Sequence, residues 1–367
     1  MPPTIVVFGA TGYTGRLTAE RLVERGAAPV LAGRSESRLR ELSDRLGGLE
    51  VRAADVDRPE SVAALLEPGD VLISCVGPFL RWGEPAVRAA IEKGAIYLDS
   101  TGEPPFIRRV FDEFGAAARE AGATLMPAMG YDFVPGAVAG ALALEAAGAQ
   151  ASRVDVGYFM LGAGPSSMSA GTKASLAGVA LSEAFAYRGG DVRAVRSAER
   201  YRTFPVKGKE RPGISVGGAE HYTLPAVYPQ LQEVNVYLGW FGPLARGIQL
   251  TSGITAAATR VSAVKRALMA GGTKLASLGG SPEAGTTPDA LSWIPAAAYG
   301  SGSDAPLAEV ALTGADGYAF TAGFLAWAAR RAAAEGVRAT GAAGPLEAFG
   351  LEAVVAGCSE AGLDKNV

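Results

Sequence analysis

A glycine-rich turn between an apolar strand and a helix constrains the fold more than any other feature of the sequence. Residues 4–8 are apolar, and Gly9, Gly12 and Gly15 follow at three-residue spacing before an amphipathic helix. In a dinucleotide site the first glycine permits a tight turn, the second lets the backbone approach a pyrophosphate, and the third lets the helix pack on the strand. The stretch predicts a nucleotide-binding loop rather than a merely structural strand–turn–helix. We assign to this loop Gly9, Thr11, Gly12, Tyr13, Thr14 and Gly15.

The end of the second predicted strand favours NADPH over NADH. An NAD-preferring site usually has Asp or Glu at this point to bind the ribose hydroxyls, and this chain has Arg34 and Ser35 instead. A guanidinium and a hydroxyl suit a 2′-phosphate, which a carboxylate would repel. We therefore predict NADP(H) as the cofactor and assign Arg34 and Ser35 to its site. The alternative is a solvent-facing arginine that caps the next helix.

Composition and charge exclude several classes of protein. The 367 residues are enough for about two domains, and 49% hydrophobic residues exclude a disordered chain. A net charge of −3 without a lysine or arginine cluster argues against a nucleic-acid partner. The two cysteines, Cys75 and Cys358, cannot build a disulfide framework, so we expect a cytoplasmic location.

Neither a membrane-spanning segment nor a metal site is expected. The first strand begins at once, which leaves no room for a signal peptide, and the apolar stretches 134–149 and 320–334 both carry charges. The chain has a single histidine, His221, which excludes a multi-histidine metal site and leaves one candidate for a hydrolytic triad. We therefore expect metal-independent chemistry other than hydrolysis.

Strand and helix signals alternate through the first 150 residues. This alternation predicts an α/β fold with a Rossmann-type doubly wound parallel sheet, covered by helices on both faces, and a ligand at the carboxyl ends of the strands. The expected strands lie near 4–8, 29–33, 49–54, 70–75, 95–99 and 123–127, and the expected helices near 14–25, 35–46, 59–67, 83–93, 105–121 and 135–147.

The pattern changes after about residue 150. Alternating polar and apolar runs that start at Arg153, Asp191, Glu199 and Glu233 predict a second α+β domain built on an antiparallel sheet. Residues 279–306, rich in Gly, Pro, Ser and Ala, are expected to form a long loop, with helices near 321–335 and 345–362 after it. The expected domains are 1–135 for NADP binding, 136–314 for substrate binding and dimerisation, and 315–367 for terminal helices.

Two further strand ends carry residues that suit the cofactor site. The third expected strand leads into Asp55 and Val56. The fourth leads into a Gly-Pro pair, in which glycine permits a close approach and proline stiffens the turn. We assign to the cofactor site Asp55, Val56, Cys75, Val76, Gly77 and Pro78.

The fifth and sixth expected strands end in groups that suit proton transfer. Asp99 and Glu103 fit substrate binding or a proton relay, and equally fit a helix N-cap. Tyr131, assisted by Asp132, is the stronger candidate proton donor, because a phenol beside a cleft can protonate the atom left negative by hydride addition. The alternative for them is a packed tyrosine and a turn-forming aspartate. Lys173 follows several serines and offers either a cation for the cleft or part of a helix cap.

The segment 236–250 is aromatic and apolar, and Gly and Pro interrupt it. It fits a greasy substrate tunnel, a dimer interface or a surface that touches a membrane. Ordinary core is the alternative.

Five short motifs occur in one order along the first third of the chain. They begin at Gly9, Ala32, Cys75, Asp99 and Gly130 and read Gly-Ala-Thr-Gly-Tyr-Thr-Gly, Ala-Gly-Arg, Cys-Val-Gly-Pro-Phe, Asp-Ser-Thr-Gly-Glu and Gly-Tyr-Asp-Phe-Val-Pro. In these motifs the chain resembles the saccharopine dehydrogenase-like family, specifically the branch with bacterial trans-acting enoyl reductases. The Tyr-x-x-x-Lys pair of classical short-chain dehydrogenases is missing. The resemblance implies NADP(H), hydride transfer, and terminal helices that return to the nucleotide domain.

Three functions follow from these expectations. Members of the family reduce C=C bonds of lipid or polyketide intermediates or C=N bonds of amino-acid adducts, and the apolar segment favours the first. A C=N site should offer several arginines to hold carboxylates. The third function is a nucleotide-binding scaffold or sensor without turnover. The expected partners are a small-molecule or acyl-chain substrate, a second copy in a homodimer, and a lipid surface touched peripherally.

Overall fold

The computed structural model describes residues 3–162, 184–258, 291–314 and 316–365. The chain divides into two compact units, each with its own sheet. Unit 1 consists of Met1–Thr101, Phe106–Val134 and Gly317–Gly362. Unit 2 consists of Gly102–Pro105, Pro135–Asp316 and Leu363–Val367.

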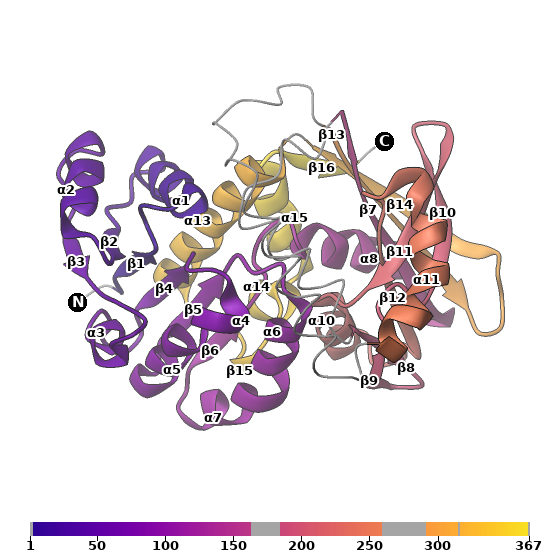
Figure 1. Ribbon diagram of the computed structural model, residues 1–367, viewed down its shortest axis with the longest axis horizontal. Coiled ribbons are helices and arrows are strands. Elements are labelled where there is room, and N and C mark those ends of the chain that lie inside the picture. The colour runs from indigo at the N-terminus through magenta and orange to yellow at the C-terminus, as the bar shows by residue number, and fades with distance from the viewer. Residues whose placement is uncertain (1–2, 163–183, 259–290, 315, 366–367) are drawn as a thin grey trace. The chain divides into compact units, whose positions relative to one another are not determined.

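The sheet of unit 1 is parallel throughout and has seven strands in the order β15-β6-β5-β4-β1-β2-β3. Strands β1, β2 and β4 are buried at every position, which is why they read in the sequence as continuous apolar runs. The strands, indigo to purple in Figure 1 except for the yellow β15, are β1 (Ile5–Phe8), β2 (Val30–Gly33), β3 (Val51–Ala53), β4 (Val71–Ser74), β5 (Ile96–Asp99), β6 (Thr124–Met126) and β15 (Gly341–Ala342).

Helices alternate with these strands, so the predicted Rossmann-type fold is confirmed. The long helix that follows residue 316 packs on α1 and β4 within the same unit. The helix predicted over 105–121 is divided by a π-helical turn, Val110–Phe114. The helices are α1 (Tyr13–Glu24), α2 (Glu36–Arg45), α3 (Pro59–Ala63), α4 (Phe79–Trp82), α5 (Glu84–Lys93), α6 (Pro104–Arg109), α7 (Gly115–Glu120), α13 (Gly317–Glu335), α14 (Pro345–Phe349) and α15 (Leu351–Glu360).

Unit 2 is built on a nine-stranded sheet in the order β10-β11-β12-β7-β13-β14-β16, with β8 paired to β12 and β9 to β8. The strands are β7 (Ala151–Leu161), β8 (Ala184–Arg188), β9 (Asp191–Val195), β10 (Tyr201–Val206), β11 (Lys209–Val216), β12 (Glu233–Leu238), β13 (Leu291–Gly300), β14 (Pro306–Gly314) and β16 (Leu363–Lys365). The described helices of this unit include α8 (Val134–Ala147), α10 (Glu220–Val227) and α11 (Ala245–Ala258).

Two details of unit 2 differ from the sequence-based expectation. The sheet is mixed rather than purely antiparallel, because β12 pairs with β7 in parallel. The predicted loop 279–306 is wrong over Leu291–Gly300, which forms the central strand β13 between β7 and β14. Alanine-rich runs have low strand propensity, and here pairing on both sides outweighs that preference. Residues 279–290 lie outside the described residues.

The apolar segment 236–250 covers the end of β12, a turn and the first residues of α11. Tyr237 is buried, whereas Leu244 and Leu250 are 71% and 64% exposed. In the described part of the chain, no helix combines the length and apolarity needed to cross a membrane. Within the same residues there is no group of three or more His, Cys, Asp or Glu that could hold a metal ion.

Candidate functional site

The predicted nucleotide loop packs on the end of β4. Gly9 has φ +84°, a conformation that favours glycine. A Cβ atom on Gly9 would lie 3.0 Å from Cγ2 of Val76 and 3.1 Å from the carbonyl atoms of Cys75. The backbone N–H of Cys75 donates to the carbonyl of Phe8 at 2.8 Å. The loop and the end of β4 are therefore in contact with no space for a side chain between them.

The other two glycines serve different purposes. A Cβ atom on Gly15 would lie 2.3 Å from the carbonyl oxygen of Gly9, so α1 can approach the loop only with glycine there. Gly12 is exposed, and a Cβ atom there would meet a single neighbour, the same oxygen at 3.2 Å. As the N-cap of α1, Gly12 provides no side-chain cap, and the first turn has no acid. The start of α1 is thus suited to an anion.

The remaining loop residues surround this helix start. Thr11 is exposed, and Tyr13 and Thr14 are half-buried. The ring of Tyr13 meets the ring of Tyr318 edge to face, with 5.2 Å between centroids. Because Tyr318 is in α13, the terminal helix reaches the nucleotide loop inside unit 1.

The ends of β2 and β3 lie beyond the loop in the same sheet. The Arg34 side chain is exposed, and Ser35 is the N-cap of α2. Asp55 accepts the N–H of Asp57 at 3.1 Å, so it organises a local turn, and Val56 packs against the core of the sheet. An exposed guanidinium beside a helix N-cap fits a 2′-phosphate, and the structure contains no acid at that position of β2.

The end of β4 contributes an uncharged surface. Burial raises the pKa of the Cys75 thiol to about 12, so the thiol stays neutral at physiological pH. This thiol is hydrogen-bonded to Ser100, which follows β5. Gly77 packs against the ring of Phe79, and Pro78 is the N-cap of α4.

Asp99 at the end of β5 is fully buried and well supplied with hydrogen bonds. Its carboxylate accepts the Tyr97 hydroxyl at 2.7 Å and the N–H groups of Thr101 and Ala128, each at 2.8 Å. Burial, reinforced by the Asp99 charge, raises the pKa of Tyr97 well above its ordinary value. Because Ala128 follows β6, this one carboxylate connects the ends of two neighbouring strands.

Tyr131 and Asp132 occupy the turn after β6. Tyr131 is 6% exposed, and its ring packs edge to face on Phe320 at 6.4 Å. Asp132 is half-buried, and its Oδ1 atom is enclosed with no hydrogen-bond partner among the described residues. Burial raises the pKa of this carboxyl from an ordinary 3.8 to about 6. A carboxyl of this kind can hold a proton near neutral pH and release it.

Comparison with known proteins agrees with the nucleotide loop and the parallel sheet. Residues 5–126 match the family model described as saccharopine dehydrogenase NADP binding domain. These residues, about a third of the chain, are thus similar to a saccharopine dehydrogenase NADP-binding domain. The match extends from β1 to β6 and so contains every predicted cofactor residue. It confirms the predicted family resemblance and the predicted cofactor, NADP(H).

Similar proteins are named for an enoyl reductase activity. Over 137 residues the chain is 38% identical to proteins named trans-acting enoyl reductase from Mycobacterium ulcerans and Mycobacterium tuberculosis. That stretch is 36% of this chain and 33% of each relative, so the chain matches about a third of their length.

One solved structure extends the likeness to the whole fold. Saccharopine dehydrogenase (L-Glu forming) from Saccharomyces cerevisiae superposes with a TM-score of 0.61 over 100% of this chain and 99% of its own. The sequence identity is 11%, so the likeness concerns the fold alone.

One predicted catalytic residue, Glu103, is not part of unit 1, although it lies within the matched residues 5–126. Glu103 is buried in the short segment Gly102–Pro105, which belongs to unit 2. Lys173 lies outside the described residues. Tyr131 and Asp132 are therefore the candidate catalytic residues that unit 1 itself contains.

Unit 2 contains two residues that could suggest hydrolysis, Ser215 and His221. Ser215 stands in a Gly-x-Ser-x-Gly sequence, but it lies inside β11, where its Oγ accepts the N–H of Arg200 at 2.9 Å. A nucleophile elbow instead needs a strand-to-helix turn. His221 is 1% exposed, accepts the N–H of Gly218 through Nδ1, and has its pKa lowered to about 4 by burial. Both residues have structural roles.

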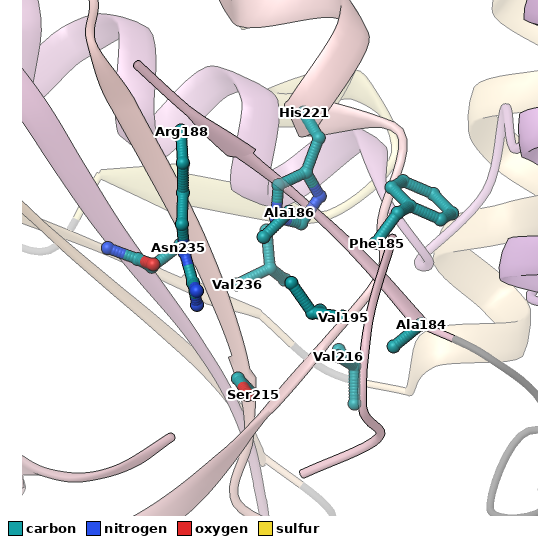
Figure 2. Close-up of a pocket in the computed structure, with 10 residues that line it drawn as sticks. All are labelled: Ala184, Phe185, Ala186, Arg188, Val195, Ser215, Val216, His221, Asn235 and Val236. Carbon is teal, nitrogen blue, oxygen red and sulfur yellow. The ribbon is translucent and has the colours of Figure 1, made fainter. Parts of the chain in front are cut away.

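Both side chains line a small cavity in unit 2 (Figure 2). Arg188 and Asn235 contribute further polar groups, and alanines and valines complete the wall. The space open to the centre of a water molecule is about 10 Å³, which is room for one water. The cavity is too small for an organic substrate.

Proposed function

We propose that this protein is an NADPH-dependent oxidoreductase that reduces the C=C bond of an enoyl intermediate of the lipid or polyketide type. The names of its relatives point to this reaction, and the match to an NADP-binding domain supports the cofactor that it needs. The arrangement of Asp132 is the single observation that carries the proposal, because it places a proton-holding carboxyl at a strand end of that parallel sheet.

The residues of the glycine loop would hold the pyrophosphate at the start of α1, and Arg34 with Ser35 would hold the 2′-phosphate. NADPH supplies a hydride when bound. With that hydride on its β-carbon, an enoyl thioester would carry the electron pair of the former C=C π bond at its α-carbon. Asp132 then gives its proton to the α-carbon, which completes a saturated thioester, and the carboxylate recovers a proton from solvent. Tyr131, the preceding residue of the same turn, would assist Asp132 in this proton transfer.

The arginines of unit 2 weigh against reduction of an amino-acid imine. Such a substrate needs guanidinium groups free to bind its carboxylates. On the sheet of unit 2, Arg200 is paired with Glu233 and Arg202 with Asp155. Arg153 stacks on the ring of Tyr299 at 4.1 Å. Arg153 also pairs with Asp155 at 3.9 Å and with Asp304 at 3.7 Å, so acids already pair with all three of these cations.

A spectrophotometric screen tests the proposal. Purified protein is mixed with NADPH, and the loss of absorbance is followed with enoyl thioesters of increasing chain length, and separately with an aldehyde plus an amino acid. We expect oxidation with an enoyl thioester. Oxidation with the imine mixture alone would favour C=N reduction, and tight NADPH binding without oxidation by any substrate would favour a scaffold or sensor.

A further inference from the structure

The turn that contains Asp132 is bonded to helix α13 through the hydroxyl of Thr321. The backbone N–H of Tyr131 donates to Oγ1 of Thr321 at 3.0 Å. The same hydroxyl donates to the carbonyl oxygen of Gly317 at 2.7 Å, one turn earlier in α13. Thr321 is 8% exposed, so water does not readily replace either bond.

Close packing on both sides sets the position of this hydroxyl. A Cβ atom on Gly130 would lie 2.8 Å from Cγ2 of Thr321, and one on Gly317 would lie 3.0 Å from Cγ of Tyr131. The first contact is closer than real Cβ atoms come, and the second is tighter than most of them. The Gly130 backbone therefore packs closely on the Thr321 side chain, and the Gly317 backbone packs closely on the Tyr131 ring.

The backbone hydrogen bonds within the turn do not involve the N–H of Tyr131, which donates to Thr321 in α13 instead. Phe133 donates its N–H to Ala128 at 3.2 Å, and Val134 donates to Gly130 at 3.1 Å. These bonds close the turn around Tyr131 and Asp132 but do not use the N–H of Tyr131. The bond to Thr321 holds the Gly130–Tyr131 peptide, one residue before Asp132.

We infer that Thr321 is a positioning residue for Asp132, because it holds the Gly130–Tyr131 peptide and so keeps the turn that carries the carboxyl in place after β6. This inference rests on the proposed function, in which Asp132 donates the proton. Thr321 itself would touch neither cofactor nor substrate, and would act only through Asp132. Its loss should therefore lower kcat while the affinity for NADPH stays the same.

Two substitutions separate the hydroxyl from the shape of the side chain. Thr321→Val keeps the volume and removes the acceptor, and Thr321→Ser keeps the acceptor and removes a methyl group. With NADPH and an enoyl thioester, we expect kcat to fall about tenfold in Thr321→Val, since small displacements of a reacting group cost this much or more. In Thr321→Ser, kcat should lie within about threefold of that of the unmodified protein. Thr203→Val, exposed on β10, is the matched control and should leave kcat unchanged.

A double-mutant cycle with Asp132→Asn distinguishes positioning from a general loss of structure. If Thr321 acts through Asp132, Thr321→Val causes no further loss in the Asp132→Asn background. Losses that multiply, or an unchanged kcat in Thr321→Val alone, would overturn the inference. If Asp132→Asn keeps full turnover, the proposed proton donor is wrong instead. NADPH titration and circular dichroism confirm folding, and Thr321→Ala replaces the valine variant if that variant does not fold.

Discussion

The turns after β5 and β6 each carry a buried or half-buried aspartate, and the two are supplied with hydrogen bonds very differently. Asp99 accepts three hydrogen bonds from Tyr97, Thr101 and Ala128. Asp132 has an enclosed oxygen with no partner in the described part of the chain. The first environment stabilises a carboxylate, whereas the second raises the pKa of the carboxyl to about 6. Two aspartates at one edge of a sheet can therefore serve structure and chemistry separately.

The two turns also depend on each other. Asp99 binds the N–H of Ala128, the residue at which the β6 turn begins, and its carbonyl oxygen accepts the N–H of Met129 at 2.8 Å. The well-bonded acid thus shapes the turn that presents the other acid. Function at Asp132 should be sensitive to the integrity of Asp99, and the same chemical substitution at the two sites should have different consequences.

The largest expected effect is on catalysis by Asp132→Asn. Asparagine has nearly the same shape but cannot donate the proton, so we expect kcat to fall by roughly 10²–10⁴. The NADPH dissociation constant should change by less than about twofold, since the glycine loop is untouched. Stopped-flow NADPH oxidation and fluorescence titration measure the two quantities. Asp44→Asn, exposed in α2, is the control. Normal turnover in Asp132→Asn would contradict a catalytic role for Asp132.

Asp99→Asn should mainly lower stability. The amide cannot accept from the Tyr97 hydroxyl and both N–H groups as the carboxylate does, and a buried donor is left unsatisfied. We expect a loss of about 3 kcal/mol in the free energy of unfolding, measured by urea denaturation. If Asp99→Asn were as stable as the unmodified protein, the hydrogen bonds of Asp99 would not stabilise the fold, and its structural role would be wrong.

The pH dependence of stability sharpens the contrast at Asp132. The pKa of Asp132 is raised to about 6 in the folded protein, so the folded state binds this proton more tightly than the unfolded chain does. The resulting contribution to the free energy of unfolding is fully present below pH 4 and is lost as the pH rises through 6. The free energy of unfolding of the unmodified protein, relative to Asp132→Asn, should therefore fall between pH 4 and pH 7 by up to roughly 2–3 kcal/mol. Urea unfolding at several pH values gives this difference, and a constant difference would contradict the raised pKa.

The smallest expected effect concerns a third strand end, that of β2. Arg34 is exposed and offers its charge to a ligand rather than to the fold. Arg34→Ala should weaken NADPH binding about tenfold and leave NADH binding nearly unchanged, because a charge-assisted contact to the 2′-phosphate is lost. Calorimetric titration of both cofactors measures this, with Arg45→Ala in α2 as the control. Equal affinities of the unmodified protein for NADPH and NADH would exclude the predicted preference.

The sequence predicted unit 1 well because its signals are local. Continuous apolar strands, the three glycines and the intervening amphipathic helices depend on residues that are neighbours in the chain, and β1 to β6 appear where expected. It predicted unit 2 less well. The alanine-rich β13 has weak strand propensity, and the parallel pairing of β7 with β12 depends on chain segments about 80 residues apart.

By itself, the sequence determined the nucleotide-binding fold, the family resemblance and the short list of acids at the strand ends. It favoured Tyr131 with Asp132 for proton transfer, but it could not show how the environments of Asp99, Glu103 and Asp132 differ, because the three look alike as residue types. Tertiary structure ranked them: hydrogen-bond donors satisfy Asp99, Glu103 is buried in unit 2, and one oxygen of Asp132 is enclosed without a partner among the described residues. It also brought Thr321 to Tyr131 across 190 residues of chain. The protonation state of a buried carboxyl depends on such distant neighbours, and no local pattern encodes them.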